Sequence, residues 1–292
     1  MKTFNVKAVV KLGLSRVLFY FYKLKYRSAE VYKPPTETEL MRIEEEFQQQ
    51  GIVLHYLYID TADYEKFKKV FKFPADYYAN SPVREEKFLE HYVSYKLLDL
   101  ERREVYIDIA ACNSPWAKVL RDHGINAYAL DIQEQYMYSD FEYYLVQDAT
   151  KTNFPRCSID SASLQCAYEM FLGNDDIKLI YELKRILKPS GKVIILPLYM
   201  HTHNCHYSSP EFYGKGFGDP DSKEYINWDC WGIPASRKYS VSKLKKRILD
   251  LVSELGMSYK VYVLKNKREI ADCIYLHFIL EISKDFNYDT SQ

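Results

Sequence analysis

The stretch Val105–Asp131, VYIDIAACNSPWAKVLRDHGINAYALD, constrains the fold of this chain more than any other. It opens with a short apolar run, Val105–Ile109, which predicts a buried strand. Helical spacing over Trp116–His123 ends at Gly124, where a helix C-cap is expected. The apolar run Asn126–Leu130 predicts a second strand. The stretch therefore reads as strand, helix and strand, the first βαβ unit of a nucleotide-type binding fold.

After this unit, apolar runs and helical spacing continue to alternate along the chain. Further strands are predicted at Tyr143–Val146, Ser161–Cys166, Lys192–Leu196, Tyr259–Leu264 and Ile274–Ile282, and further helices at Asp175–Leu187 and Val241–Leu255. Such alternation favours an α/β fold with a mainly parallel sheet covered on both faces. The last two strands, joined by a short polar turn, predict an antiparallel edge hairpin.

Residues 1–100 are expected to form a mostly helical N-terminal extension or cap, and residues 101–292 the main domain. Helical patterns cover Thr36–Gln50, Asp63–Phe71 and Val83–Leu100, the last leading into the Val105 strand. Residues 199–240 are rich in aromatic residues, glycine and proline. We expect them to form an irregular insertion, because they are too long for an ordinary loop.

Composition limits the partners and the location of the protein. The 40 basic and 40 acidic residues balance, so no global field attracts nucleic acid, and no nucleic-acid partner is expected. Six scattered cysteines without C-x-x-C pairs match neither a zinc ribbon nor a disulfide framework, and they favour a reducing cytoplasm. No apolar run reaches the roughly 18 residues that a membrane-spanning helix needs.

The N-terminal residues 4–27 combine apolar and aromatic side chains with basic ones such as Lys7, Lys11 and Arg16. This pattern is typical of an amphipathic helix lying on an anionic membrane surface. It also fits a helix that packs on the main domain or on a second subunit of a homo-oligomer, and we favour packing. The expected location is cytoplasmic, with peripheral contact at the inner membrane surface as the alternative.

The order of these parts resembles the class I S-adenosylmethionine-dependent methyltransferases over about residues 100–283. Asp108–Ser114 lies where that family has D-x-G-x-G-x-G, and Asp131 lies where its acidic residue binds the ribose hydroxyls. Asp148-Ala149 lies where an acidic residue faces the adenine. Leu187–Ile195, LKPSGKVII, is similar to the family's turn into strand five and is the most specific signal. The resemblance implies a Rossmann-like, mainly parallel seven-stranded sheet with an antiparallel last strand.

The resemblance implies S-adenosylmethionine as the cofactor and a set of residues that hold it. These are Asp108, Ala110, Ala111, Cys112, Ser114, Asp131, Ile132, Asp148, Ala149 and Gln165. Three small residues, Ala110, Cys112 and Ser114, replace the family's glycines, which serve where the backbone approaches the ligand closely or needs a positive φ. Because small side chains and all three carboxylates are kept, we expect a working cofactor site.

The acceptor site is expected mainly in the insertion at residues 199–240. Predicted substrate contacts are Glu169, Tyr199, Tyr207, Trp228, Trp231 and Arg237. A neutral imidazole can accept a proton from a group as it is methylated, so His201 or His203 is the predicted general base. In an extended segment these histidines share one face with Cys205. The spacing H-x-H-x-C-H matches no structural zinc pattern, however, and no metal is expected.

The predicted function is methyl transfer from S-adenosylmethionine to a hydroxyl or amine of a small molecule or glycan precursor. The alternative is a catalytically inactive methyltransferase-like scaffold that acts through protein or membrane-surface contacts. A nicotinamide-dependent oxidoreductase would use Asp131 equally well. The turn and strand at Lys188–Ile195 argue against that class.

Overall fold

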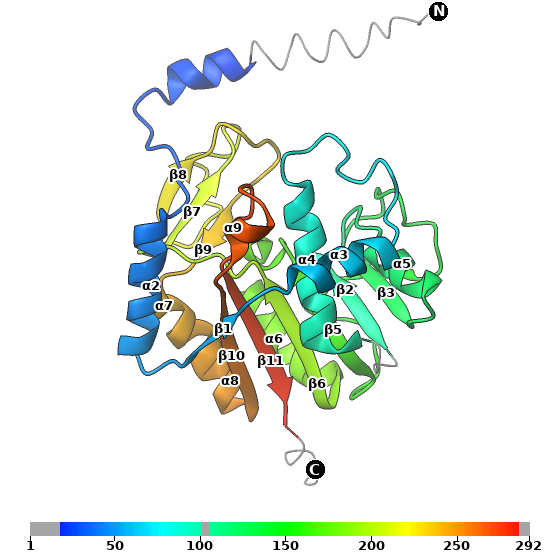
Figure 1. The fold of residues 1–292 in the computed structure, drawn as a ribbon. Coiled ribbons are helices and arrows are strands. Elements are labelled where there is room, and N and C mark those ends of the chain that lie inside the picture. Colours follow the sequence, from blue (N-terminus) through cyan, green and yellow to red (C-terminus); the bar gives the residue numbers. More distant parts are fainter. Residues whose placement is uncertain (1–17, 101–104, 286–292) are drawn as a thin grey trace, which may run out of the picture.

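The computed structural model describes residues 18–100 and 105–285. They form a central sheet with a layer of helices on each face (Figure 1). Eight strands lie in the order β1-β10-β11-β6-β5-β2-β3-β4. Their bounds are β1 Leu54–Leu57, β2 Tyr106–Ile109, β3 Ala127–Asp131, β4 Tyr144–Val146, β5 Ile159–Gln165, β6 Leu187–Leu196, β10 Met257–Leu264 and β11 Phe278–Lys284. Only β11 runs antiparallel to its neighbours within this sheet. The predicted Rossmann-like, mainly parallel sheet is confirmed.

Helices cover both faces of the sheet, as its buried strands require. One face carries α2 (Glu37–Gln49), α6 (Asp175–Ile186) and a continuous helix made of α7 (Val241–Leu244), a π-helical turn (Lys245–Leu249) and α8 (Asp250–Glu254). The other face carries α3 (Thr61–Val70), α4 (Arg84–Leu98) and α5 (Trp116–Asp122). All four residues of β2 are buried, so the strand lies at the centre of the core.

Local sequence explains where these helices begin. Thr36 caps α2 in a capping box: its hydroxyl accepts from the Glu39 N–H, and the Glu39 carboxylate accepts from the Thr36 N–H. Helix α6 buries Leu179, Leu183 and Ile186 at helical spacing against the sheet. These elements hold the carboxyl ends of the parallel strands at one edge, where ligands bind in open α/β sheets.

The insertion at 199–240 is not irregular, contrary to the prediction. It contains a second, three-stranded sheet in the order β8-β7-β9, with bounds β7 Cys205–Ser208, β8 Lys223–Ile226 and β9 Ser236–Lys238. Figure 1 shows this small sheet above the carboxyl-end edge of the large one. Val31 pairs with Ile226, so the chain after the N-terminal helix runs along the small sheet. The strands of the small sheet are only three or four residues long, so their alternation of apolar and polar residues is too short to recognise in the sequence.

The closing hairpin and the N-terminal region also differ from expectation. The hairpin does not form the sheet edge, because β1 pairs in parallel with β10 beyond it. This adds an eighth strand to the seven expected and makes the N-terminal region part of the sheet. The polar connection between β10 and β11 contains a short helix, α9 (Lys267–Ile270).

The described part of the N-terminal segment packs on the insertion. Residues 18–25 are helical. The Phe19 ring lies 5.6 Å from that of Trp228, and the Tyr22 ring lies 6.1 Å from that of Trp231. The basic residues at 7, 11 and 16 lie outside the described residues. None of the described helices is long and apolar enough to cross a membrane.

Candidate active site

A cavity of about 480 Å³ opens at the carboxyl ends of β2 and β5, within the size range of small-molecule sites. The turn after β2, helix α4 and two surface loops enclose it. Its lining residues are Pro74, Asp76, Tyr77, Tyr78, Lys87, Glu90, His91, Asp108, Ala110, Ala111, Cys112, Asn113, Ser114, Met137, Tyr138, Gln165 and Cys166. The structure thus brings six of the ten predicted cofactor residues together at one cavity.

The turn after β2 keeps a glycine-like backbone without any glycine. Ala110 and Cys112 have φ angles of 56° and 51°, in the left-handed region that disfavours side chains. Asn113 Oδ1 accepts a hydrogen bond of 2.7 Å from the Met137 N–H, which holds the loop after β3 beside the turn. Asp108 is buried beneath it, and burial raises the pKa of this carboxyl to about 7. The small side chains at 110 and 112 therefore preserve the shape of the turn.

Asp131 ends β3 and contacts this turn directly. Its Oδ2 accepts from the Cys112 N–H at 3.0 Å, and its Oδ1 accepts from the Gln133 N–H at 3.1 Å. A carboxylate oxygen can accept two hydrogen bonds, and each oxygen of Asp131 accepts one here. Both therefore retain capacity for a ligand hydroxyl.

Asp131 and the other three predicted cofactor residues lie outside the cavity lining. Ile132 is exposed at the end of β3. Asp148 is exposed and caps its own turn, accepting from the Thr150 N–H at 2.9 Å, and the neighbouring Ala149 is buried.

Gln165 provides a test of whether a cofactor suits the cavity. Its amide nitrogen donates to Ser163 Oγ at 3.0 Å and to Ser94 Oγ at 3.4 Å. Its Oε1 is buried and has no partner among the described residues. An unsatisfied acceptor in a ligand-sized cavity fits a positively charged or N–H-bearing ligand. The amino-acid end of S-adenosylmethionine has that chemistry.

Helix α4 supplies a polar stripe that the sequence did not reveal as a site. Lys87 Nζ lies 3.0 Å from Glu90 Oε1 and 2.7 Å from Cys166 Sγ. Burial alone would lower the pKa of Lys87. The negative charge of Glu90 has the larger opposite effect, so the pKa of Lys87 is raised. His91, the next residue after Glu90, forms a hydrogen bond with Tyr77, in which its Nε2 lies 2.9 Å from the hydroxyl oxygen. Because Lys87, Glu90 and His91 are spaced three and four apart, helical periodicity of polar residues was the signal that could have found them.

A second group of buried charges lies beyond Cys166. Glu169, in the 3₁₀ turn Tyr168–Met170, has a buried Oε2 without a partner in the described part of the chain. Burial raises the pKa of Glu169, and nearby Lys238 opposes the rise. Lys238 is 2% exposed, lies 3.7 Å above the centre of the Tyr199 ring and donates to Ser236 Oγ. Burial lowers the pKa of Lys238 to about 8.

Two of the predicted substrate tyrosines lie in this group, whereas three other predicted contacts do not. Tyr199 and Tyr207 flank the Lys238 ammonium, and Tyr199 Oη also lies 3.3 Å from Cys166 Sγ. Trp228 and Trp231 are turned toward the N-terminal helix at residues 18–25 instead. They contact that helix in place of forming the predicted substrate wall, and Trp231 remains 53% exposed.

Arg237, also a predicted substrate contact, has a structural role. Its guanidinium donates to both carboxylate oxygens of Asp219, to Asp176 and to the backbone oxygens of Phe171 and Gly173. These acceptors use all five of its N–H groups. Arg237 therefore fastens β9 to the segment before α6 and has no donor left for a substrate.

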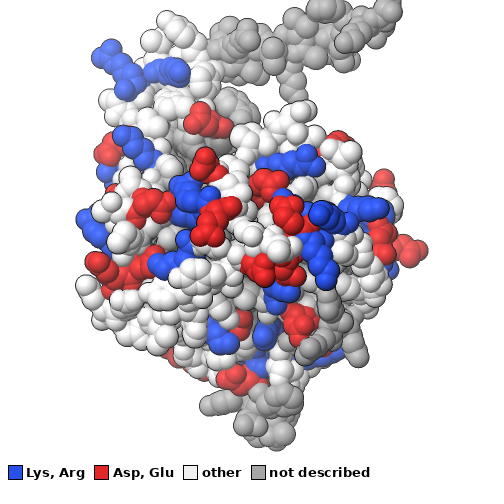
Figure 2. All heavy atoms as spheres, viewed as in Figure 1, with Lys and Arg blue, Asp and Glu red and all other residues white. Residues whose placement is uncertain are grey.

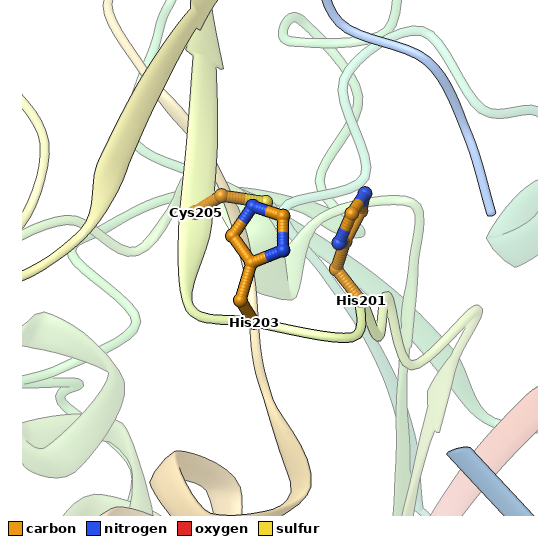
Figure 3. Close-up of side chains that lie close together, drawn as sticks. All are labelled: His201, His203 and Cys205. Atoms are coloured by element: carbon orange, nitrogen blue, oxygen red, sulfur yellow. The ribbon is translucent and has the colours of Figure 1, made fainter. Parts of the chain in front are cut away.

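The predicted catalytic histidines lie in the turn between β6 and β7, away from the cavity lining. His201 is buried and His203 partly buried, and burial lowers the pKa of both. Figure 3 shows their rings beside the sulfur of Cys205. His206 points elsewhere, because its Nδ1 bonds Ser222 Oγ.

Residues 107–195 match the family model described as a methyltransferase domain. The chain carries a class I methyltransferase domain. A mainly parallel sheet with an antiparallel last strand, here β11, is what the resemblance implied, and the recognition from sequence is confirmed. S-adenosylmethionine is the methyl donor of this class, and the fit of the cavity agrees with it.

Among solved structures, the methyltransferase domain is similar to a Burkholderia thailandensis 1,6-didemethyltoxoflavin-N1-methyltransferase, with a TM-score of 0.46 and 11% identity over 88% of this chain and 94% of that one. It is also similar to an S-adenosylmethionine-dependent methyltransferase from Archaeoglobus fulgidus, with a TM-score of 0.45 and 13% identity over 76% and 99% of the two chains. No curated protein matches the sequence. These structural likenesses are too distant to indicate an acceptor.

Proposed function

We propose that the protein methylates a hydroxyl or amine of a small molecule or glycan precursor, with Glu169 as the proton acceptor. The observation that carries the proposal is the position of Glu169. It follows β5 by four residues, and its buried Oε2 has no hydrogen-bond partner among residues 18–100 and 105–285. Gln165 and Cys166, at the end of the same strand, line the cofactor cavity, and Glu169 lies three residues beyond this lining.

When bound, the cofactor supplies a methyl group on a sulfonium and leaves as a neutral thioether. The acceptor oxygen or nitrogen gains the methyl and must lose a proton, which the Glu169 carboxylate takes. Lys238 stabilises the carboxylate form of Glu169 by its charge. Lys87 and Glu90 place a cation and an anion beside Cys166, where they can orient a polar acceptor.

The surroundings favour a small acceptor. Lys87 and Glu90 of α4 contact Cys166, and Lys238 lies buried in β9 of the small sheet, so both elements restrict the access of competing water to this region. In Figure 2, basic and acidic side chains are interspersed on the visible face, without a large basic area among its described residues. A long polyanion such as nucleic acid has no evident track there.

Two measurements test this proposal. Calorimetry with S-adenosylhomocysteine tests the cofactor site, and failure to bind at millimolar ligand would favour the inactive scaffold. An acceptor screen that follows methyl incorporation by mass spectrometry then identifies the substrate class.

With an acceptor in hand, we expect Glu169→Gln to lower kcat by about 10²–10⁴-fold, the usual contribution of a general base. Exposed Glu254→Gln is the matched control and should leave kcat unchanged. The acidic limb of the pH–rate profile should disappear in Glu169→Gln. The prediction that His201 or His203 is the base is tested in the same assay, because His203→Ala would then remove that limb instead.

A further inference from the structure

Three side chains of types that bind metal ions lie close together outside the cofactor cavity. One ring nitrogen each of His201 and His203 and the sulfur of Cys205 all lie within 4.8 Å of one another. Figure 3 shows that they project from the same turn toward a shared space. Alternate residues of an extended chain point to one side, which explains the spacing of two between them.

The backbone on both sides of this turn is held in place. The His201 N–H donates to the Tyr239 carbonyl at 2.8 Å, and Met200 pairs with Tyr239. Cys205 begins β7 and pairs with Lys238 of β9. The two ends of the ligand set are therefore fixed by strand pairing before any ion binds, which lowers the entropy cost of binding.

The histidine rings are oriented by further partners, as the rings of metal ligands usually are. The His201 ring lies 6.3 Å from that of Tyr32. His203 Nε2 lies 2.9 Å from the Tyr225 hydroxyl. These contacts come from two other segments, the extended chain after the N-terminal helix and strand β8. They limit each ring to small rotations.

The ligand types select among metal ions. A sulfur ligand disfavours Mg²⁺ and Ca²⁺, whereas two imidazoles and one thiolate suit Zn²⁺. Tetrahedral Zn²⁺ with ordinary bond lengths places its ligand atoms about 3.4–3.6 Å apart. The widest separation, up to 4.8 Å, must shorten by about 1.2–1.4 Å, which a small rotation of the partly exposed His203 side chain can provide.

We propose that His201, His203 and Cys205 bind one Zn²⁺ ion, with a water molecule at the fourth position. On binding, the Cys205 thiol releases its proton to solvent as the Zn–S bond forms. The ion ties the turn after β6 to the start of β7, and so fastens the small sheet that covers the acceptor region. This replaces the expectation from sequence spacing that the chain binds no metal.

The test uses the full chain after dialysis against a chelator. We expect calorimetry to give one Zn²⁺ per chain with a Kd of about 1 μM or below, weaker than a four-ligand structural site. Co²⁺ should produce a thiolate-to-metal absorption band in the near ultraviolet. Adventitious binding to surface histidines gives no such band, so the spectrum reports Cys205 itself.

Cys205→Ser should abolish the band and His203→Ala should weaken Zn²⁺ binding by at least about 100-fold, whereas Cys230→Ser, in the same insertion, should behave as the parent. S-adenosylhomocysteine binding by His203→Ala should be unchanged, which separates this site from the cofactor site. If Cys205→Ser fails to fold, the wild-type cobalt spectrum and His203→Ala still decide. Absence of the cobalt band in the parent, or unchanged Zn²⁺ affinity in His203→Ala, would overturn the proposal.

Discussion

Replacement of Asp131 by alanine should remove most of the affinity for the cofactor. Its two carboxylate oxygens each accept one backbone N–H, from Cys112 and Gln133, and each keeps room for a ligand hydroxyl. Hydrogen bonds to a charged acceptor contribute about 1.5–3 kcal/mol each. The loss of two such bonds amounts to about 3–6 kcal/mol, a weakening of roughly 10²–10⁴-fold in Kd.

The assay is calorimetric titration of S-adenosylhomocysteine into the parent, Asp131→Ala and the matched control Glu134→Gln, an exposed carboxylate three residues away. Glu134→Gln should bind as the parent does. The mutation also leaves the Cys112 N–H without its acceptor, so the free energy of unfolding without ligand is measured in parallel. If Asp131→Ala remains folded and binds within about threefold of the parent, which is under 1 kcal/mol, the ribose assignment is wrong.

Three further predictions concern stability. Asp176→Asn should lower the free energy of unfolding by about 3–5 kcal/mol in urea titrations, because it breaks a fully buried pair with Arg237, whereas exposed Asp175→Asn should change it by less than about 0.5 kcal/mol. Ala110→Gly should leave cofactor binding intact and raise the free energy of unfolding by up to about 1 kcal/mol, since glycine adopts the left-handed φ without strain. A clear decrease of that free energy in a urea titration would contradict this prediction. Burial beside Lys267 lowers the pKa of His277 to about 4, so only the unfolded chain takes up this proton between about pH 6.5 and 4. Stability should then fall by up to about 1.4 kcal/mol per pH unit below 6.5, and His277→Gln should flatten that slope.

The main sheet was predictable because its strands carry strong local signals. Apolar runs of five or six residues bounded by turns placed β2, β3 and β5 within two residues of their observed bounds, whereas β6 begins at Leu187, five residues before the predicted start. The small sheet was not predictable in the same way, because Cys205–Ser208 and Ser236–Lys238 are short, polar and paired only through tertiary contacts. Strand β1 was missed for a similar reason: its four residues become a strand only where β10 offers an edge.

The candidate site was half predictable. Residues that follow strand ends, such as Asp108, Cys112 and Gln165, line the cavity because parallel strands end at one edge of the sheet. Lys238 could not be assigned from spacing, since it belongs to the short strand β9 and reaches Tyr199 only through the fold. Conversely, Arg237 looked available in the sequence, and only its five acceptors show that it is occupied.

The pairing of β1 with β10 has a consequence for how the chain matures during synthesis. Residues 54–57 leave the ribosome about 200 residues before the partner strand at 257–264, so the outermost parallel pair closes only when translation is nearly complete. Until then β1 has no partner strand, and in a chain without β1 the finished β10 would be a bare edge that invites pairing with another chain. Loss of β1 should therefore show itself less as lost activity than as aggregation of newly made protein.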